Sequence, residues 1–421
     1  MTAPTPVPHD GQPPQNSPLL QGIKVLEIAT FVFGPGCSAI LSDFGASVIK
    51  VESPGLGDPL RHAHKAPPFM RSEFDYAFQQ DNRNKRSIAL DLKRPEGREV
   101  LLELVRRSDV LITNFPPAVL ERLRIRYEDL AGENARLIYA QVSGYGERGE
   151  DANTPGFDGN AYWARTGLMD AVRTAEGEPA MPSPAMGDHP SAMTLYAGVM
   201  TALYRRQLTG QGGKVSSSLM ANGLWAASSA LSGLLAGTRP YRRLNPARPG
   251  SALVNYYRTS DDRWISLIVI QDAKHWHNLL KVIERPELDE DPRFATLQPR
   301  FKHAQELSVI LADIFKTRTC AEWRARLREH KITFSVVATF EEVIDDPQAL
   351  ANDLFIAVEG HEHGRKQVVD SPFWIQDCAK VPARLGSPLG ADGAAILREL
   401  GYGEERIAQL TEGAVVALPK H

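Results

Sequence analysis

Two apolar runs near the start of the chain, Lys24-Val-Leu-Glu-Ile28 and Gly45-Ala-Ser-Val-Ile-Lys-Val51, decide the fold class. Between them, Phe33-Gly-Pro-Gly36 predicts a turn, and the segment 37–44 predicts a short helix. A strand, a helix and a second strand in this order predict a right-handed crossover with the two strands parallel. The glycines of the turn are weak support for a dinucleotide site, because Ala39 stands where that fingerprint needs its third glycine.

The same alternation of strands and helices continues to about residue 142. Further strands are predicted at 87–91, 110–113 and 137–142, with helices at 95–107 and 117–124 between them. This pattern predicts an α/β domain with an open, largely parallel sheet. Ligands bind beyond the carboxyl ends of the strands in such sheets. The candidate walls of a site are therefore the loops 29–36, 52–59, 114–117 and 143–158, together with Lys93.

A second, smaller α+β domain is predicted at 225–335. The chain has 421 residues, more than the roughly 250–300 that one hydrophobic core usually serves. An Arg- and Pro-rich stretch at 237–250 is typical of a connection, and a hairpin and three helices follow it. We therefore expect a large domain at 18–224, to which the chain returns at 336–421. Residues 1–17 have the composition of a disordered leader.

Composition excludes several classes of function. The net charge is −3 with acids and bases interspersed, so neither a nucleic acid nor a membrane surface is an expected partner. Three distant cysteines suggest neither a disulfide framework nor a zinc site, and they fit a reducing, cytoplasmic compartment. His361-Glu-His363 at a predicted hairpin tip lacks a third ligand nearby in sequence, so no metal site is expected.

The stretch from Pro184 to Arg206 combines a Pro-rich loop, an acid and an apolar helix that should begin near His189. Small residues on one side and large apolar residues on the other predict a helix buried nearly all round. Asp188 lies at the boundary between the loop and the helix, where an aspartate is either a helix cap or a catalytic group. The residue alone does not separate these two interpretations.

A set of short motifs, taken in order, resembles the class III CoA-transferases, also called the CaiB/BaiF family. The motifs are Gly22-Ile-Lys-Val-Leu-Glu27, Gly34-Pro-Gly36, Phe44-Gly-Ala-Ser-Val-Ile-Lys-Val-Glu52, Asn84-Lys-Arg-Ser-Ile-Ala-Leu-Asp-Leu-Lys93, Val110-Leu-Ile-Thr-Asn-Phe115, Ser143-Gly-Tyr-Gly146, Gly187-Asp188 and Thr209-Gly-Gln-Gly-Gly-Lys-Val215. The similarity extends from Gly22 to about Val416. The family includes formyl-CoA transferase and the α-methylacyl-CoA racemases.

The resemblance implies a Rossmann-like large domain whose sheet is formed by both chain ends, and two ring-like subunits interlinked as a homodimer. It implies an enzyme that moves CoA from an acyl-CoA to a free carboxylic acid through covalent intermediates on Asp188. Coenzyme A is then a substrate, and no tightly bound cofactor is expected. The positions that match the family's CoA contacts are Val32, Phe33, Lys93, Asn114, Phe115, Arg122 and Phe157.

The sequence leaves two alternatives to a CoA-transferase open and does not determine the substrate acid. A racemase also carries an acid at the position of Asp188, but it needs a second proton-transfer group, and Phe157 stands where family racemases have a histidine. A non-catalytic CoA-binding subunit is the other alternative. The segment after Phe157 resembles the members that act on bulky or aromatic acids, which makes Tyr162, Trp163 and Tyr257 candidates for an acyl pocket. Arg165 is a candidate partner for a second carboxylate if the acid is dicarboxylic.

Overall fold

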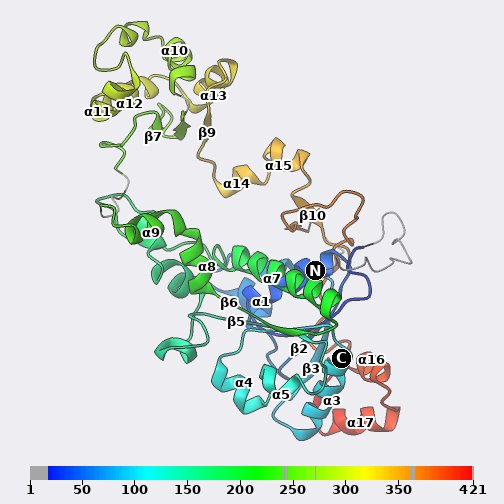
Figure 1. Cartoon of the computed structure of the whole chain (residues 1–421). Coiled ribbons are helices and arrows are strands. Elements are labelled where there is room, and N and C mark those ends of the chain that lie inside the picture. Colours follow the sequence, from blue (N-terminus) through cyan, green and yellow to red (C-terminus); the bar gives the residue numbers. More distant parts are fainter. Residues whose placement is uncertain (1–17, 240–242, 244, 271, 361–365, 420–421) are drawn as a thin grey trace, which may run out of the picture. The chain divides into compact units, whose positions relative to one another are not determined.

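The computed structural model describes residues 18–239, 243, 245–270, 272–360 and 366–419. The predicted leader 1–17 and the His361-Glu-His363 tip lie outside these residues. The chain divides into two compact units (Figure 1). The large unit comprises Met1–Leu168, Met181–Leu235 and Asn352–His421, and the small unit comprises Met169–Ala180 and Ala236–Ala351.

The large unit is built on a seven-stranded sheet with the order β12-β3-β2-β1-β4-β5-β6. Its strands are β1 (Lys24–Ile28), β2 (Ser47–Glu52), β3 (Arg86–Leu90), β4 (Val110–Thr113), β5 (Ile138–Ser143), β6 (Gly213–Ser218) and β12 (Val416–Ala417). Every pairing is parallel except that of β12, which runs antiparallel to β3. Both chain ends thus contribute to one open sheet, and the predicted α/β class is confirmed. Strands such as β4 are buried at every residue, as expected of a sheet covered on both faces.

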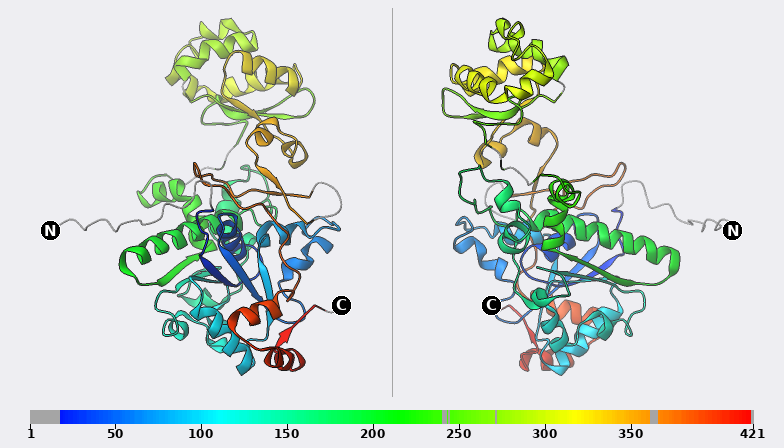
Figure 2. Two further views of the ribbon diagram at one scale, coloured as in Figure 1. Left: turned by 90° about the vertical axis from the view of Figure 1, so that its right-hand side faces the viewer. Right: turned by 60° about the vertical axis from the view of Figure 1, so that its left-hand side comes forward.

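Helices cover both faces of this sheet (Figures 1 and 2). Each face has its own hydrophobic core. One face packs against α3 (Pro95–Arg106), α4 (Pro117–Leu123), α5 (Tyr127–Leu130), α16 (Gly393–Leu400) and α17 (Glu404–Glu412). The other face packs against α1 (Phe33–Asp43), the π-helical turn η3 (Asp158–Ala164), α7 (Asp188–Thr209) and α8 (Leu219–Ala226). The remaining elements are η1 (Pro59–Lys65), α2 (Tyr76–Asn82), η2 (Glu150–Asn153), α9 (Ser228–Leu235) and the hairpin β10 (Phe355–Ala357) and β11 (Gln367–Val369).

The small unit has an antiparallel sheet in the order β7-β8-β9, packed against helices. Its elements are β7 (Val254–Arg258), β8 (Trp264–Ile268), α10 (Asp272–Ile283), η4 (Pro286–Asp289), α11 (Leu297–Lys302), α12 (Ala304–Phe315), α13 (Cys320–Glu329), β9 (Phe334–Val336), α14 (Phe340–Val343) and α15 (Pro347–Ala351). The short helix α6 (Leu168–Ala171) lies where the two units meet in sequence. Trp276, Phe315 and Trp323 are fully buried in the core of this unit.

Two local predictions were wrong. The expected turn at Phe33–Gly36 is the first turn of α1. Helix α7 is not buried all round within this chain, because Tyr204 and Leu208 are 66% and 68% exposed. Its buried residues occupy one face only.

The small unit differs from the predicted range of 225–335. It begins later, at Ala236, ends at Ala351, and also includes Met169–Ala180. An ion pair joins each of the two added segments to the rest of the unit. Asp170 pairs with Arg243 at 2.9 Å, and Glu342 of α14 pairs with Arg263 at 2.7 Å. Such contacts between residues distant in sequence are not visible in local patterns.

Candidate active site

Asp188 is the first residue of α7, one residue earlier than predicted. The N-cap position is Gly187, and no side chain caps the helix there. A Cβ atom on Gly187 would lie 2.3 Å from Oδ1 of Asp158 and 2.4 Å from the ring of Tyr162, so only glycine fits this approach. Among the described residues, none donates a hydrogen bond to the Asp188 carboxylate. The helix-cap interpretation of Asp188 is therefore wrong.

Asp188 lines a cavity of about 210 Å³ in the large unit. The cavity lies where parallel sheets bind ligands, beyond the carboxyl ends of β1, β4 and β5. Its lining is mostly apolar. The lining residues are Thr30, Phe31, Val32, Phe33, Asn114, Phe115, Pro116, Val142, Ser143, Gly144, Ala152, Thr154, Pro155, Gly156, Phe157, Asp188 and Leu219.

The structure brings six of the residues predicted for catalysis and CoA binding to this one cavity. Asp188 is one of them. The other five come from three separate loops and are Val32, Phe33, Asn114, Phe115 and Phe157. Lys93, after β3, and Arg122, on α4, are both exposed and lie outside the lining of the cavity. Their predicted contacts with CoA remain predictions.

The residues predicted for an acyl pocket are spread over both units. Tyr162 is buried beside Gly187, and Trp163 packs against Tyr162 at 5.7 Å between ring centroids. Arg165 is exposed and pairs with Asp151 at 3.0 Å. Tyr257 belongs to the core of the small unit, where its hydroxyl donates to the Ala252 carbonyl at 2.6 Å. Tyr257 therefore has a packing role, and its predicted contact with substrate stays a prediction.

Burial and a neighbouring carboxylate make Asp188 an unusually weak acid. Burial first, and then the negative charge of Asp158, raise the pKa of Asp188 to about 7. Burial also raises the pKa of Asp158. The backbone N–H of Gly187 donates to Oδ1 of Asp158 at 3.0 Å. The other carboxylate oxygen of Asp158, Oδ2, is buried and has no hydrogen-bond partner in the part of the chain that the structure describes. Asp158 thus holds the glycine that precedes Asp188 and opposes ionisation of Asp188.

His189 and Asp81 form a second pair beside Asp188 that the sequence did not reveal. His189 Nε2 lies 3.1 Å from Oδ1 of Asp81. Burial favours the neutral ring, but Asp81 and Asp188 outweigh it and raise the pKa of His189 to about 9. At neutral pH the ring is therefore a cation next to Asp188. Its adjacency to Asp188 was visible in the sequence, but its partner is 108 residues away.

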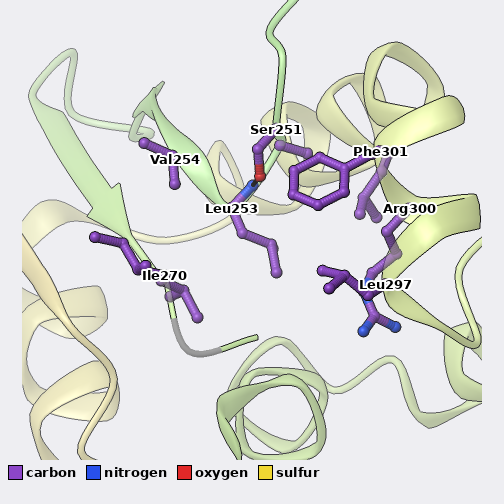
Figure 3. Close-up of a pocket in the computed structure, with 10 residues that line it drawn as sticks. Ser251, Leu253, Val254, Ile270, Leu297, Arg300 and Phe301 are labelled. Atoms are coloured by element: carbon purple, nitrogen blue, oxygen red, sulfur yellow. Dashed lines mark hydrogen bonds between the residues drawn. The ribbon is translucent and has the colours of Figure 1, made fainter. Parts of the chain in front are cut away.

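A second cavity, of about 120 Å³, lies inside the small unit (Figure 3). Apolar side chains such as Leu253, Leu297 and Phe301 surround it, and no carboxylate is among its described lining residues. No predicted site residue lines it. Over the described ranges, no group of three or more metal-ligating side chains is present. Likewise, no helix in this part of the chain is long and apolar enough to span a membrane.

Comparison with known proteins agrees with this arrangement. The family model of CoA-transferase family III matches residues 20–393. The chain is 32% identical over 403 residues to (R)-2-hydroxy-4-methylpentanoate CoA-transferase of Clostridioides difficile, covering 94% of this chain and 99% of that protein. It is 30% identical over 415 residues to cinnamoyl-CoA:phenyllactate CoA-transferase of Clostridium sporogenes, covering 96% and 99%.

A solved structure supports the same assignment. A CAIB/BAIF family protein from Brucella suis matches with a TM-score of 0.80 and 30% sequence identity, covering 92% of this chain and 100% of that one. The matches extend over both units rather than over the sheet alone. The chain therefore belongs to CoA-transferase family III and is an enzyme that transfers coenzyme A.

Proposed function

We propose that this enzyme moves CoA from an acyl-CoA donor to a free carboxylic acid, with Asp188 as the covalent acyl carrier. The observation that carries the proposal is the position of the Asp188 carboxylate. It lines the cavity together with five residues that match the family's CoA contacts, and no described side chain or backbone group uses it as a hydrogen-bond acceptor.

The reaction proceeds in four balanced steps at Asp188. A carboxylate oxygen attacks the thioester carbonyl carbon of the donor, the C–S bond breaks, and CoA leaves as a thiolate. The thiolate then attacks the carbonyl carbon of Asp188 in the mixed anhydride, which releases the donor acid as a carboxylate and leaves an aspartyl-CoA thioester. The acceptor carboxylate attacks that thioester and expels the thiolate. Attack of the thiolate on the acceptor's acyl carbon yields the new acyl-CoA and restores Asp188.

The environment of Asp188 suits this chemistry. A carboxylate whose pKa is raised to about 7 is a better nucleophile than an ordinary one, and the absence of capping hydrogen bonds leaves its electron pairs available. The backbone N–H groups at the start of α7 lie nearby and favour developing negative charge. Protonated His189 adds a positive charge beside the reacting carboxylate.

A racemase reaction is not favoured, because the relatives named above are CoA-transferases and because of the residue before Asp158. Phe157 occupies the loop position where a proton donor would be needed and cannot exchange a proton. The test is to follow a 2-methylacyl-CoA in deuterium oxide by mass spectrometry. We expect no deuterium at the α-carbon, whereas rapid exchange would revive the racemase.

We propose that the acids carried are monocarboxylic, with a bulky apolar or aromatic side chain. Two relatives are named for (R)-2-hydroxy-4-methylpentanoate and for phenyllactate, and the cavity at Asp188 is lined mainly by aromatic and aliphatic residues. Arg165, the candidate partner of a second carboxylate, already pairs with Asp151. We further expect Lys93 and Arg122 to contact CoA, and the enzyme to act as an interlocked homodimer in the cytoplasm.

The decisive experiment combines loss of function with trapping. Asp188→Ala should lower turnover at least 10⁴-fold, a typical order of magnitude for the loss of a nucleophile, while its circular dichroism stays normal. Asp345→Ala, at an exposed acid of the small unit, is the matched control and should keep full activity. Hydroxylamine added with an acyl-CoA should leave a hydroxamate on the peptide that contains Asp188. Near-normal turnover of Asp188→Ala would refute the mechanism.

A further inference from the structure

The loop between β1 and α1 contains a residue in an unusual backbone conformation. Phe31 has a φ of 61°, in the left-handed region that residues other than glycine rarely adopt. Such a conformation persists only when the surrounding structure holds it in place, and it is often found at functional sites. The neighbours of this loop must therefore hold Phe31 in its conformation.

Hydrogen bonds from three different elements hold consecutive residues of this loop. Lys50 Nζ donates to the carbonyl of Ala29 at 3.0 Å. The side-chain amide of Asn114 accepts from the N–H of Thr30 at 3.0 Å and donates to its carbonyl at 2.6 Å. The N–H of Phe31 donates to Oδ1 of Asp58 at 3.1 Å. Asp58 is therefore the group that holds the strained residue itself.

Asp58 is fixed by a set of buried ionic side chains, Glu27, Lys50, Asp58 and Lys85, which we call the buried charge network. Asp58 is completely buried, and its Oδ2 pairs with Lys50 Nζ at 2.8 Å. Lys50 also pairs with Glu27, which in turn pairs with Lys85 at 2.7 Å. With its carboxylate anchored to Lys50, Asp58 has little freedom to move away from the N–H of Phe31.

The side chain of Phe31 reaches the cavity of Asp188. Its ring packs edge-to-face against Phe157, with centroids 5.6 Å apart and planes at 87°. Phe31 and Phe157 remain 38% and 55% exposed, and both line the cavity. The direction of the Phe31 side chain follows from its backbone conformation, so a change of φ would move the ring away from Phe157.

We propose that Asp58 is a positioning residue that acts through Phe31. The buried charge network holds the Phe31 backbone in its left-handed conformation, and the paired rings of Phe31 and Phe157 then form a preformed aromatic wall that contacts the acyl-CoA. This inference rests on the proposed role of the cavity as the acyl-CoA site. Because the wall binds substrate and takes no part in bond making, its loss raises KM and changes kcat little.

A double-mutant cycle on KM for the acyl-CoA tests the proposal. Phe31→Ala removes the ring, and Asp58→Asn weakens the contact that orients it. Each should raise KM about ten-fold, the effect expected for the loss of one aromatic contact. The double variant should raise KM no further than either single variant, because both act on one ring. Multiplicative effects, or an unchanged KM in Phe31→Ala, would overturn the proposal.

Two further variants separate positioning from stability. Asp43 is also a buried carboxylate of the large unit, paired with Arg83 at 2.6 Å, so Asp43→Asn should lower the melting temperature and leave KM unchanged. Phe31→Gly keeps the left-handed backbone without strain and should show the KM of Phe31→Ala with a higher melting temperature. If both Asp58→Asn and Asp58→Ser failed to fold, Asp58 would be a folding residue and the positioning role would be rejected.

The outcome is distinguishable from failure of the proposed function. If Asp188→Ala kept turnover while the KM cycle behaved as expected, the covalent mechanism would be wrong and the aromatic wall would stand. If Asp188→Ala lost turnover and Phe31→Ala kept the normal KM, the mechanism would stand and the wall would be wrong.

Discussion

Two regions of the molecule shift the pKa of a carboxylate in opposite directions. The pKa is lowered in the buried charge network and raised in the acid pair of Asp188 and Asp158. Glu27 is completely buried, and burial alone opposes its ionisation, yet the ammonium groups of Lys50 and Lys85 hold its pKa at about 2. Asp188 is half-buried beside another acid, and its pKa is raised to about 7. Alternating charges fix a loop in place in the first region. In the second region, burial and then a like charge raise the pKa of a carboxylate at the expense of stability.

The comparison also shows that burial does not determine the state of a carboxylate by itself. The more deeply buried acid is the stronger one, because two cations and the hydroxyl of Ser38 contact it. Burial likewise lowers the pKa of Lys85 to about 8, with Glu27 opposing that shift. Nearby charges of opposite sign overcome burial at Glu27, whereas burial is the larger cause at Asp188 and at Lys85.

The largest effect on stability is expected when the buried charge network is broken. Glu27→Gln removes the carboxylate that two buried ammonium groups share, and leaving buried charges uncompensated typically costs about 3–5 kcal/mol. Urea unfolding monitored by circular dichroism measures the loss. Glu121→Gln, at an exposed pair with Arg126, is the control and should change the free energy of unfolding by less than about 1 kcal/mol. Equal effects of the two substitutions would contradict the comparison.

The opposite effect is expected at Asp188. Its pKa in the folded state, about 7, exceeds the ordinary value of 3.8, so the folded state binds this proton more tightly than the unfolded state does. The ionised carboxylate therefore costs stability fully above pH 7, and the cost disappears as the pH falls towards 4. Asp188→Asn should raise the free energy of unfolding by about 2 kcal/mol at pH 8, allowing for partial solvent exposure.

Melting curves of Asp188→Asn and the unaltered enzyme, recorded from pH 4 to pH 8, check this prediction. The two proteins should have nearly the same melting temperature at pH 4 and diverge as the pH rises. A variant less stable than the parent at pH 8 would mean that Asp188 is paired favourably, as the acids of the buried charge network are.

A smaller effect, on the pH dependence of the rate, is expected when the charge of Asp158 is removed. The rate of the parent enzyme should rise with pH around a midpoint near 7, as Asp188 ionises. Asp158→Asn removes the neighbouring charge but keeps an oxygen for the N–H of Gly187, so the midpoint should fall by roughly one pH unit. The pH dependence of kcat/KM, which reports the pKa of the free enzyme, measures the shift. An unmoved midpoint would show that burial alone raises the pKa of Asp188.

The smallest effect is expected at Arg165, where an exposed pair lies outside both regions. Its partner Asp151 is 3.0 Å away and half-exposed, and such pairs contribute at most about 1 kcal/mol. Arg165→Ala should thus change the melting temperature little. The rate of the variant is also measured with one monocarboxylic and one dicarboxylic acceptor. A rate that falls only with the dicarboxylic acid would show that Arg165 contacts the substrate.

The fold was predictable from the sequence because it rests on local patterns. Apolar runs alternate with helical segments through the first 142 residues, and this rhythm alone predicts the parallel sheet and the loops that line the cavity. The resemblance added that both chain ends form the sheet, whereas nothing in Val416–Ala417 indicates its partner β3. The exposed face of α7 was not predicted, because the spacing of apolar residues shows that a helix face is apolar but not whether another element covers that face.

The contacts that organise the site were not predictable, because each joins residues far apart in sequence. Asp58 reaches Phe31 across 27 positions, and His189 reaches Asp81 across 108. The positive φ of Phe31 has no signal in its residue type, since aromatic residues rarely adopt that conformation. The residue types around Asp188 were visible in the sequence, whereas the charges that set its pKa depend on the folded chain.

The position of β12 has a consequence for how the protein is made. The strand that borders β3 and the helices that complete one core, α16 and α17, are synthesised after every other element that the structure describes. Until they emerge, the nascent chain presents β3 as an unpaired edge and leaves apolar surface of α3 uncovered, which are conditions that favour aggregation. The large unit therefore completes its fold only after synthesis of the small unit has ended.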